Sequence, residues 1–111
     1  MRKALLFIIM KNILYIGRHP EILETVVRLI NNNEDWFGAG AETDETAMEL
    51  FQSINFHIVL LGCGIEPESE EKLRAFFATT NPNCSIVQHY GGGSGLLKNE
   101  ILSALENHNM V

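Results

Sequence analysis

The sequence predicts one α/β domain built on a parallel sheet of four strands, in the spatial order 2-1-3-4, with helices on both faces. Four apolar, strand-forming runs recur along the 111 residues, and each is followed by a segment with apolar residues at helical spacing. Strands that alternate with helices in this way imply right-handed crossovers and a doubly wound sheet. A chain of this length with 46% hydrophobic residues can bury one core, so we expect a single domain.

The first unit is a strand over residues 13–16 and a helix from residue 20. The apolar run stops at Gly17, and Pro20 stands where a helix accepts proline as its first residue. One buried face of the helix is predicted by six apolar residues: Ile22, Leu23, Val26, Val27, Leu29 and Ile30. The Asn- and Asp-rich stretch 31–35 ends it, because these side chains compete for helical hydrogen bonds.

The second and third units repeat this order. A weak, glycine-containing strand at 36–41 precedes a helix that begins at Thr43 as N-cap, with Ala47, Leu50 and Phe51 directed to the core. The nearly continuous apolar run 56–61 is typical of a central parallel strand buried on both faces. It ends at a turn with two glycines, and Pro67 begins a helix whose buried residues are Leu73, Phe76 and Phe77.

The fourth unit is a strand over 84–90, a glycine-rich loop at 91–95 and a final helix. That helix carries five apolar residues: Leu96, Leu97, Ile101, Leu102 and Leu105.

Charge and cysteine content restrict the partners and the compartment. The formal charge is −6, and the eight Lys and Arg residues form no cluster, so we expect no nucleic-acid partner. Cys63 and Cys84 would fall at opposite ends of neighbouring strands, out of disulfide reach, as free thiols of a reducing compartment. We therefore expect a cytoplasmic protein without a cofactor.

Residues 1–10 form an apolar extension before the domain at 11–111. The apolar stretch at 4–9 is too short to cross a membrane and lacks a cleavage site, so we expect neither insertion nor export. It is instead expected to cover an apolar patch or to pair with an exposed strand edge, which the fourth strand would offer. The resulting prediction is a homodimer with residues 4–9 buried between chains.

The candidate site lies at the carboxyl ends of the strands, where parallel sheets of this kind place their ligands. Arg18 and His19 follow the first strand there. A metal site from His19, Cys63 and His89 would suit Zn²⁺, but no two of these ligands are close in sequence, and we expect no bound metal. Cys63 with a histidine could also form a nucleophile pair, so a small enzyme using Cys63 and His89 is an alternative.

The loop at 91–95 is the positive sign of ligand binding. Backbone N–H groups of a glycine-rich strand-to-helix turn, aided by Ser94 and the helix dipole, can hold an anion, and Arg18 can add a charge. The loop could equally be a plain connection. The predicted ligand-binding residues are Arg18, His19, Gly62, Cys63, His89, Tyr90, Gly92, Gly93 and Ser94.

Two segments resemble a known family. Ile-Leu-Tyr-Ile-Gly-Arg-His-Pro-Glu-Ile at 13–22 is similar to the first strand and turn of bacterial response-regulator receiver domains, and His-Ile-Val-Leu-Leu-Gly at 57–62 is similar to their third strand. The resemblance implies a flavodoxin-like fold, here shortened by one βα unit. In that family two acidic residues after the first strand hold Mg²⁺ and an Asp after the third strand accepts a phosphoryl group. Those positions fall on Gly17, Arg18 and Gly62.

The resemblance therefore implies a receiver-like domain that cannot be phosphorylated and that acts through protein contacts in signalling or regulation. Phosphoryl transfer needs a carboxylate nucleophile and a cation, which these residues do not provide. The alternative is a small anion- or nucleotide-binding module that uses the loop at 91–95 and Arg18.

Overall fold

The computed structural model describes residues 10–89, 91 and 94–109, and the side chains among them up to Glu106, that of Ser94 excepted. Residues 1–9 of the predicted N-terminal extension at 1–10, and the candidate residues Tyr90, Gly92 and Gly93, lie outside the described residues. The elements are β1 (Lys11–Ile16), α2 (Pro20–Asn31), β2 (Trp36–Ala41), α3 (Asp44–Ser53), β3 (Ile58–Leu61), α4 (Pro67–Thr80), β4 (Ser85–Gln88) and α5 (Ser94–Asn109).

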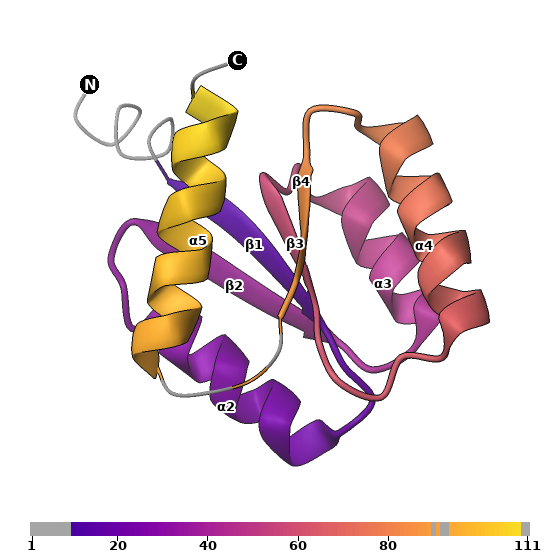
Figure 1. Ribbon diagram of the computed structural model, residues 1–111, viewed down its shortest axis with the longest axis horizontal. Helices are drawn as coiled ribbons and strands as arrows, with labels where there is room; N and C mark the ends of the chain where they lie inside the picture. Colours follow the sequence, from indigo (N-terminus) through magenta and orange to yellow (C-terminus); the bar gives the residue numbers. More distant parts are fainter. Residues whose placement is uncertain (1–9, 90, 92–93, 110–111) are drawn as a thin grey trace.

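The four described strands form one parallel sheet in the order β2-β1-β3-β4, which confirms the predicted fold. Helices α2 and α5 cover one face, and α3 and α4 cover the other (Figure 1). Strands β1 and β3 are central, whereas β2 and β4 form the two edges of the described sheet. All four strands point in one direction, so the loops that follow them meet at one edge.

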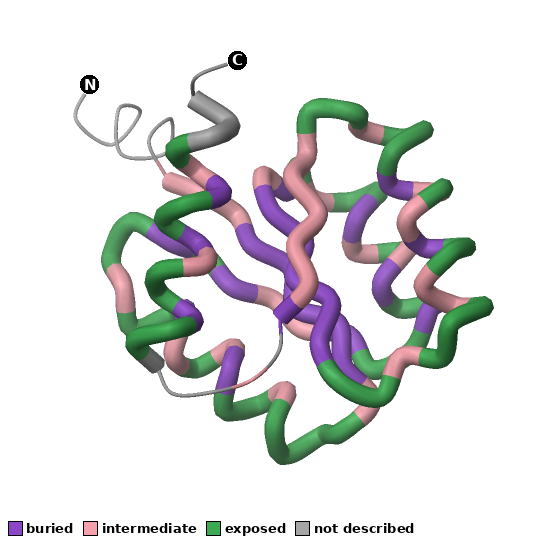
Figure 2. Tube along the Cα trace, viewed as in Figure 1, coloured by how far each residue is buried: buried purple, intermediate pink, exposed green. Residues whose placement is uncertain are grey.

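The core has two halves, one on each face of the sheet. Odd-numbered residues of β1 face α2 and α5, and even-numbered residues face α3 and α4, as the period of a strand requires. The first half includes Ile13, Tyr15, Val26, Ile30, Trp36, Ile58, Leu60, Leu97, Ile101 and Ala104. The second includes Leu14, Ile16, Ala41, Ala47, Phe51, Phe56, Val59, Leu61, Leu73 and Phe77. Figure 2 shows this burial concentrated in the central strands.

The predicted helix starts are confirmed. Pro20 and Pro67 occupy the first turns of α2 and α4. Thr43 caps α3, because its hydroxyl accepts a hydrogen bond of 3.1 Å from the backbone N–H of Thr46. These three helices therefore begin where the sequence places a residue suited to the first turn.

One predicted core residue, Ile22, is exposed, and so are two apolar residues of α5. Ile22 is 41% exposed, because it lies in the first turn of α2 and the core is reached only by the later turns. Leu96 and Leu102 are each 46% exposed, since each is one residue, or about 100° of helix, away from the buried residues Leu97 and Ile101. The apolar residues of α5 cover more than one face of the helix, so the sequence alone does not identify the buried face.

The expectation of two free thiols is confirmed. Cys63 follows β3 and is exposed, whereas Cys84 directly precedes β4 and is half-buried. Burial raises the pKa of the Cys84 thiol to about 12, so it stays protonated. Among the described helices, none is long and apolar enough to cross a membrane.

Candidate functional site

The candidate site lies where β1, β3 and β4 end. Gly17 and Arg18 follow β1, Gly62 and Cys63 follow β3, and His89 follows β4. Backbone hydrogen bonds hold these loops together: the N–H of Arg18 donates to the carbonyl of Cys63 at 3.2 Å, and that of Gly62 donates to Ile16 at 2.7 Å. The turns after β1 and β3 therefore form one continuous surface.

The side chain of Tyr15 fills the centre of this surface. It is 1% exposed and extends along β1 past Gly17 and Gly62. A β-carbon on Gly17 would lie 2.8 Å from Cε2 of Tyr15, and one on Gly62 would lie 2.7 Å from Cε1. Real β-carbon contacts are not that short, so both positions must lack a side chain while Tyr15 keeps its place.

The phenol of Tyr15 remains neutral in this environment. Burial raises its pKa to about 12, and the negative charge that Cys63 can carry adds to the effect. The ring also meets the imidazole of His89 edge to face, with ring centroids 6.0 Å apart. Tyr15 therefore joins the ends of β1, β3 and β4 by packing.

Arg18 joins the loops through charge. Its Nη2 lies 2.7 Å from Oδ1 of Asp44, its Nε donates to Oε1 of Glu66 at 3.1 Å, and its Nη1 donates to the carbonyl of Glu42 at 2.6 Å. These partners come from the β2–α3 loop, the start of α3 and the residue before α4. The guanidinium is thus held by three acceptors, which is the geometry that arginine favours.

Asp44 is the buried member of this cluster. Its side chain is 8% exposed, and Nζ of Lys72 lies 3.2 Å from its second oxygen. Burial alone would raise the pKa of Asp44, but hydrogen bonds from Arg18, Ser69 and Lys72 outweigh burial and lower it. The carboxylate is therefore ionised at neutral pH, and each of its two oxygens has a cationic partner.

A second polar pair lies on the other side of Tyr15. Nδ1 of His89 makes a short hydrogen bond with Oε1 of Glu100, which links the end of β4 to α5. The two side chains are 5% and 15% exposed. A buried pair of this kind satisfies both partners and fixes α5 against the sheet.

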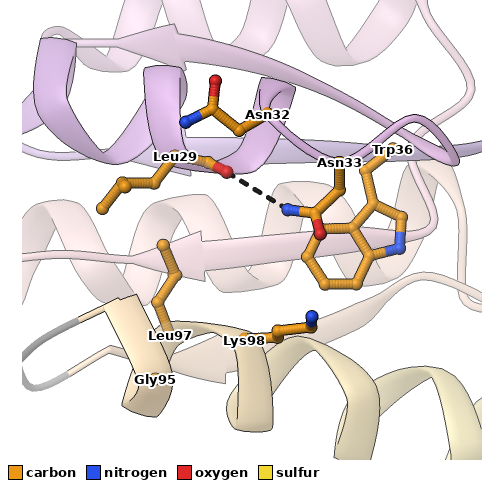
Figure 3. A pocket seen from close by; sticks show the side chains of 7 residues that line it. All are labelled: Leu29, Asn32, Asn33, Trp36, Gly95, Leu97 and Lys98. Carbon is orange, nitrogen blue, oxygen red and sulfur yellow. Dashed lines mark hydrogen bonds between the residues drawn. The ribbon is translucent and has the colours of Figure 1, made fainter.

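Three grooves lie beside α2, beside α5 or at the carboxyl ends of the strands. One of about 470 Å³ includes Tyr15, Cys63, Gln88 and His89 in its lining, and a neighbouring one of about 440 Å³ shares Ile22, His89 and Gly91 with it. The third, about 270 Å³, lies between Trp36, Leu29 and the first turns of α5, where the Nδ2 of Asn33 donates to the carbonyl of Leu29 (Figure 3).

The predicted site residues divide into three groups. Gly62, Cys63 and His89 line the 470 Å³ groove together. Arg18 is directed to its acidic partners, and His19 is an exposed N-cap residue without a side-chain cap bond. Gly91 has a φ of +93°, and Ser94 begins α5. The anion site at 91–95 stays a prediction, because Gly92 and Gly93 are not among the described residues.

Metal binding finds no support in the described residues, which contain no group of three side chains suited to hold an ion. His19 does not line the groove that contains Cys63 and His89. Nδ1 of His89 is engaged by Glu100.

Sequence reasoning missed the residues that shape the site: Tyr15, Asp44, Glu66 and Glu100. The apolar strand pattern accounts for Tyr15 without a site, and acidic residues such as Asp44 and Glu66 are common at helix starts, where the dipole favours them. One available signal was Tyr15 itself, a bulky residue two positions before Gly17 on the same face of the strand. No such signal in the sequence indicated Glu100, because its contact with His89 depends on how α5 crosses the sheet.

Comparisons with known proteins agree at the level of fold. No family model matches the chain, and none of the curated proteins matches it. The signal receiver domain of an HD domain-containing protein from Pseudomonas fluorescens Pf-5 is similar with a TM-score of 0.79 at 14% identity, over 92% of this chain and 99% of that one. A response regulator receiver domain protein from Clostridium thermocellum has a TM-score of 0.63 at 18% identity, over 87% of this chain and 76% of that one.

Response regulator TrrA from Thermotoga maritima, whose structure is a complex with Mg(2+)-BeF, has a TM-score of 0.60 at 24% identity, over 74% of this chain and 72% of that one. This chain therefore has a doubly wound α/β fold of the flavodoxin-like class. Within that class, its fold is that of response-regulator receiver domains.

Proposed function

We propose that this chain is a receiver-like domain that accepts no phosphoryl group and acts in signalling or regulation through contacts with other proteins. The observation that carries the proposal is the position of Tyr15. Its ring occupies the space that side chains at positions 17 and 62 would need. By the resemblance described above, these are positions where receiver domains carry an acidic Mg²⁺ ligand and the phospho-acceptor.

The available groups do not fit the chemistry of aspartyl phosphorylation. That reaction needs a carboxylate nucleophile at position 62 and acidic ligands for a cation. Gly62 has no side chain, and the adjacent Tyr15 is a neutral phenol with a pKa raised to about 12 by burial. The second acidic position is Arg18, whose charge repels Mg²⁺.

The carboxylates that contact Arg18 do not replace the missing ones. Asp44 and Glu66 both accept hydrogen bonds from Arg18, and Asp44 also pairs with Lys72. Arg18 thereby ties together three loops around the site. We infer that the domain is held in one arrangement and that its contacts do not depend on phosphorylation.

The face of α2 and α5 is the best candidate for such contacts. Ile22 is exposed on α2 and lines both the 470 Å³ and the 440 Å³ grooves. An exposed apolar side chain beside concave surface is typical of protein interaction sites. This supports a protein partner for that face.

The phosphorylation part is tested with acetyl phosphate and Mg²⁺. We expect no mass increase of one phosphoryl group on the intact protein, while a receiver domain with its acceptor Asp, treated in parallel, gains one. Beryllofluoride with Mg²⁺ should likewise leave the amide NMR spectrum around Gly62 unchanged. A phosphoryl adduct on this chain would refute the proposal.

The contact part is tested with a matched pair of surface variants. Ile22→Asp should abolish capture of a protein partner from a cell extract, whereas Phe37→Asp, on the exposed outer part of β2, should retain it. Equal capture by both variants would show that the α2–α5 face is not the contact surface.

A further inference from the structure

The two edge strands of the described sheet differ in how their backbone groups are satisfied. In a parallel strand, alternate residues direct their N–H and C=O groups to one neighbour and the others direct them away. The N–H groups of Lys11 and Gly17 donate to the carbonyls of Asp35 and Ala41. The residues of β2 that alternate with these, Trp36, Gly38 and Gly40, therefore direct their backbone groups away from β1. At β4, the N–H groups of Ser85 and His89 donate to the carbonyls of His57 and Leu61. The outward residues of β4 are therefore Ile86 and Gln88.

The β2 edge is blocked by side chains of its own unit. The amide of Asn31 donates to the carbonyl of Gly38 at 3.0 Å and accepts from its N–H at 2.8 Å. The N–H of Trp36 donates to the carbonyl of Asn33 at 3.2 Å. A strand approaching β2 would have to displace these bonds.

The β4 edge has no comparable protection. Within the described residues, the N–H groups of Ile86 and Gln88 have no hydrogen-bond acceptor on their outward side. Strand β4 has the sequence Ser-Ile-Val-Gln, without charge or proline, and all four residues are half-buried. Natural proteins usually protect an exposed edge with lysine, proline or a bulge, and an unprotected edge recruits another strand.

The chain contains a segment suited to that edge. Residues 4–9 read Ala-Leu-Leu-Phe-Ile-Ile, six apolar residues without charge, proline or glycine, and three of them strongly favour strands. Only Met10 separates this run from β1. It is longer than the four-residue edge that it would cover.

Its own β4 edge is too far away for the whole run to pair there. A strand outside β4 would lie three strand spacings from β1, or about 14 Å. The two Cα steps from residue 9 to residue 11 span at most about 7 Å. The edge of a second molecule is not limited by this tether.

We propose that residues 4–9 of one copy add a strand to the β4 edge of a second copy, so that the protein is a strand-exchanged homodimer. The added strand would bond to the outward N–H and C=O groups of Ile86 and Gln88. Its apolar side chains would extend the two halves of the core. This inference does not depend on the proposed function, because it rests on the outward backbone groups of β4 and on residues 4–9, and not on the contact of Tyr15 with Gly17 and Gly62.

Light scattering tests the assembly on the full chain. The wild type should have twice the 12.5 kDa mass of one chain. Leu6→Pro with Ile8→Pro, which removes strand N–H groups from the run, should give a monomer. So should Gln88→Pro, which removes an outward N–H and the side-chain bond to Leu61 but leaves the backbone bonds between β3 and β4 in place. Lys3→Pro, outside the run, is the matched control and should leave the dimer intact.

Amide hydrogen exchange of the wild type tests the pairing without relying on any variant. The N–H groups of Ile86 and Gln88 should be protected at high protein concentration and exchange rapidly at low concentration, while that of Gly40 exchanges rapidly at both. A monomeric wild type would overturn the proposal. So would a dimer that survives either proline variant, or amides at 86 and 88 that exchange as rapidly as that of Gly40.

Discussion

The ring of Tyr15 lies within 3.0 Å of where a β-carbon of Gly62 would stand. Gly62 is buried and its φ is not positive, so its backbone conformation would accept other residues. The requirement for glycine therefore comes from the neighbouring side chain alone. Because Tyr15 is buried on β1, it cannot swing aside at low cost.

This relationship predicts strong coupling between the two positions. Gly62→Ala should reduce the free energy of unfolding by about 3 kcal/mol, at the upper end for overpacking. In a Tyr15→Leu background the same change should cost at least about 1.5 kcal/mol less, because the space is then free. Urea unfolding of the four proteins measures the coupling.

Gly95 provides the control for that cycle. No atom lies within 4 Å of the position of its β-carbon, and it lies in α5. Gly95→Ala should be neutral or stabilise by up to about 1 kcal/mol. Additive effects of the Tyr15 and Gly62 changes would contradict the steric interpretation.

The second prediction concerns stability in acid. The pKa of Asp44 is lower in the folded protein than its usual value, so the unfolded chain takes up a proton at higher pH than the folded one does. The stabilisation from Asp44 is therefore complete above about pH 4 and disappears as the pH falls through the folded-state pKa. Arg18→Gln should lower stability at pH 7 by about 1–3 kcal/mol and flatten the loss in acid.

The half-exposed pair of Arg74 with Glu70 is the comparison for this prediction. These residues are four apart on α4 with an Nε to Oε2 distance of 2.9 Å. Arg74→Gln should change stability by at most about 0.5 kcal/mol. If Arg18→Gln is equally mild in urea unfolding at pH 7, the Arg18 cluster contributes little to the fold.

The third prediction concerns the attachment of α5. Glu100→Gln weakens the bond to the buried His89 and should lower the free energy of unfolding by about 1–3 kcal/mol. Amide exchange in α5 should rise more than in α3 or α4, since His89 links α5 to β4. Glu106→Gln, at an exposed position of the same helix, should leave both measurements unchanged. An equal rise in amide exchange in all helices would show that the pair of His89 and Glu100 does not hold α5 in particular.

The fourth prediction concerns the β2 edge. Asn31→Ala removes both side-chain hydrogen bonds to Gly38 and frees its N–H and C=O groups. We expect a loss of about 1–2 kcal/mol of stability and concentration-dependent association beyond a dimer in light scattering. Asn32→Ala, at an exposed neighbouring position with no described side-chain bond to β2, is the control.

The sequence predicted the fold well, because strands, glycine turns and helix starts are recorded in local patterns. The helix start at Pro20 and the N-cap at Thr43 follow from residues next to one another, and both are confirmed. The interior of the site could not be predicted in the same way. Tyr15 meets Gly62 across 47 positions, and Arg18 meets Glu66 across 48, so these contacts exist only once the sheet has formed.

The buried faces of the helices were also difficult to predict from the sequence. Leu96 and Leu102 match a helical apolar pattern as well as Leu97 and Ile101 do, yet only the latter pair is buried. The choice depends on how α5 rotates against the sheet. The Glu100 bond to His89 contributes to that rotation, and no local pattern in the sequence indicates it.

The position of Tyr15 also affects how this chain can change over evolutionary time. An aspartate introduced at position 62 alone would collide with the ring, and an acidic residue at position 17 alone would do the same. Replacing Arg18 alone would leave the buried Asp44 with one fewer cation. Each of these single substitutions would thus destabilise the protein, so a cluster of carboxylates could arise at these positions only after Tyr15 had changed.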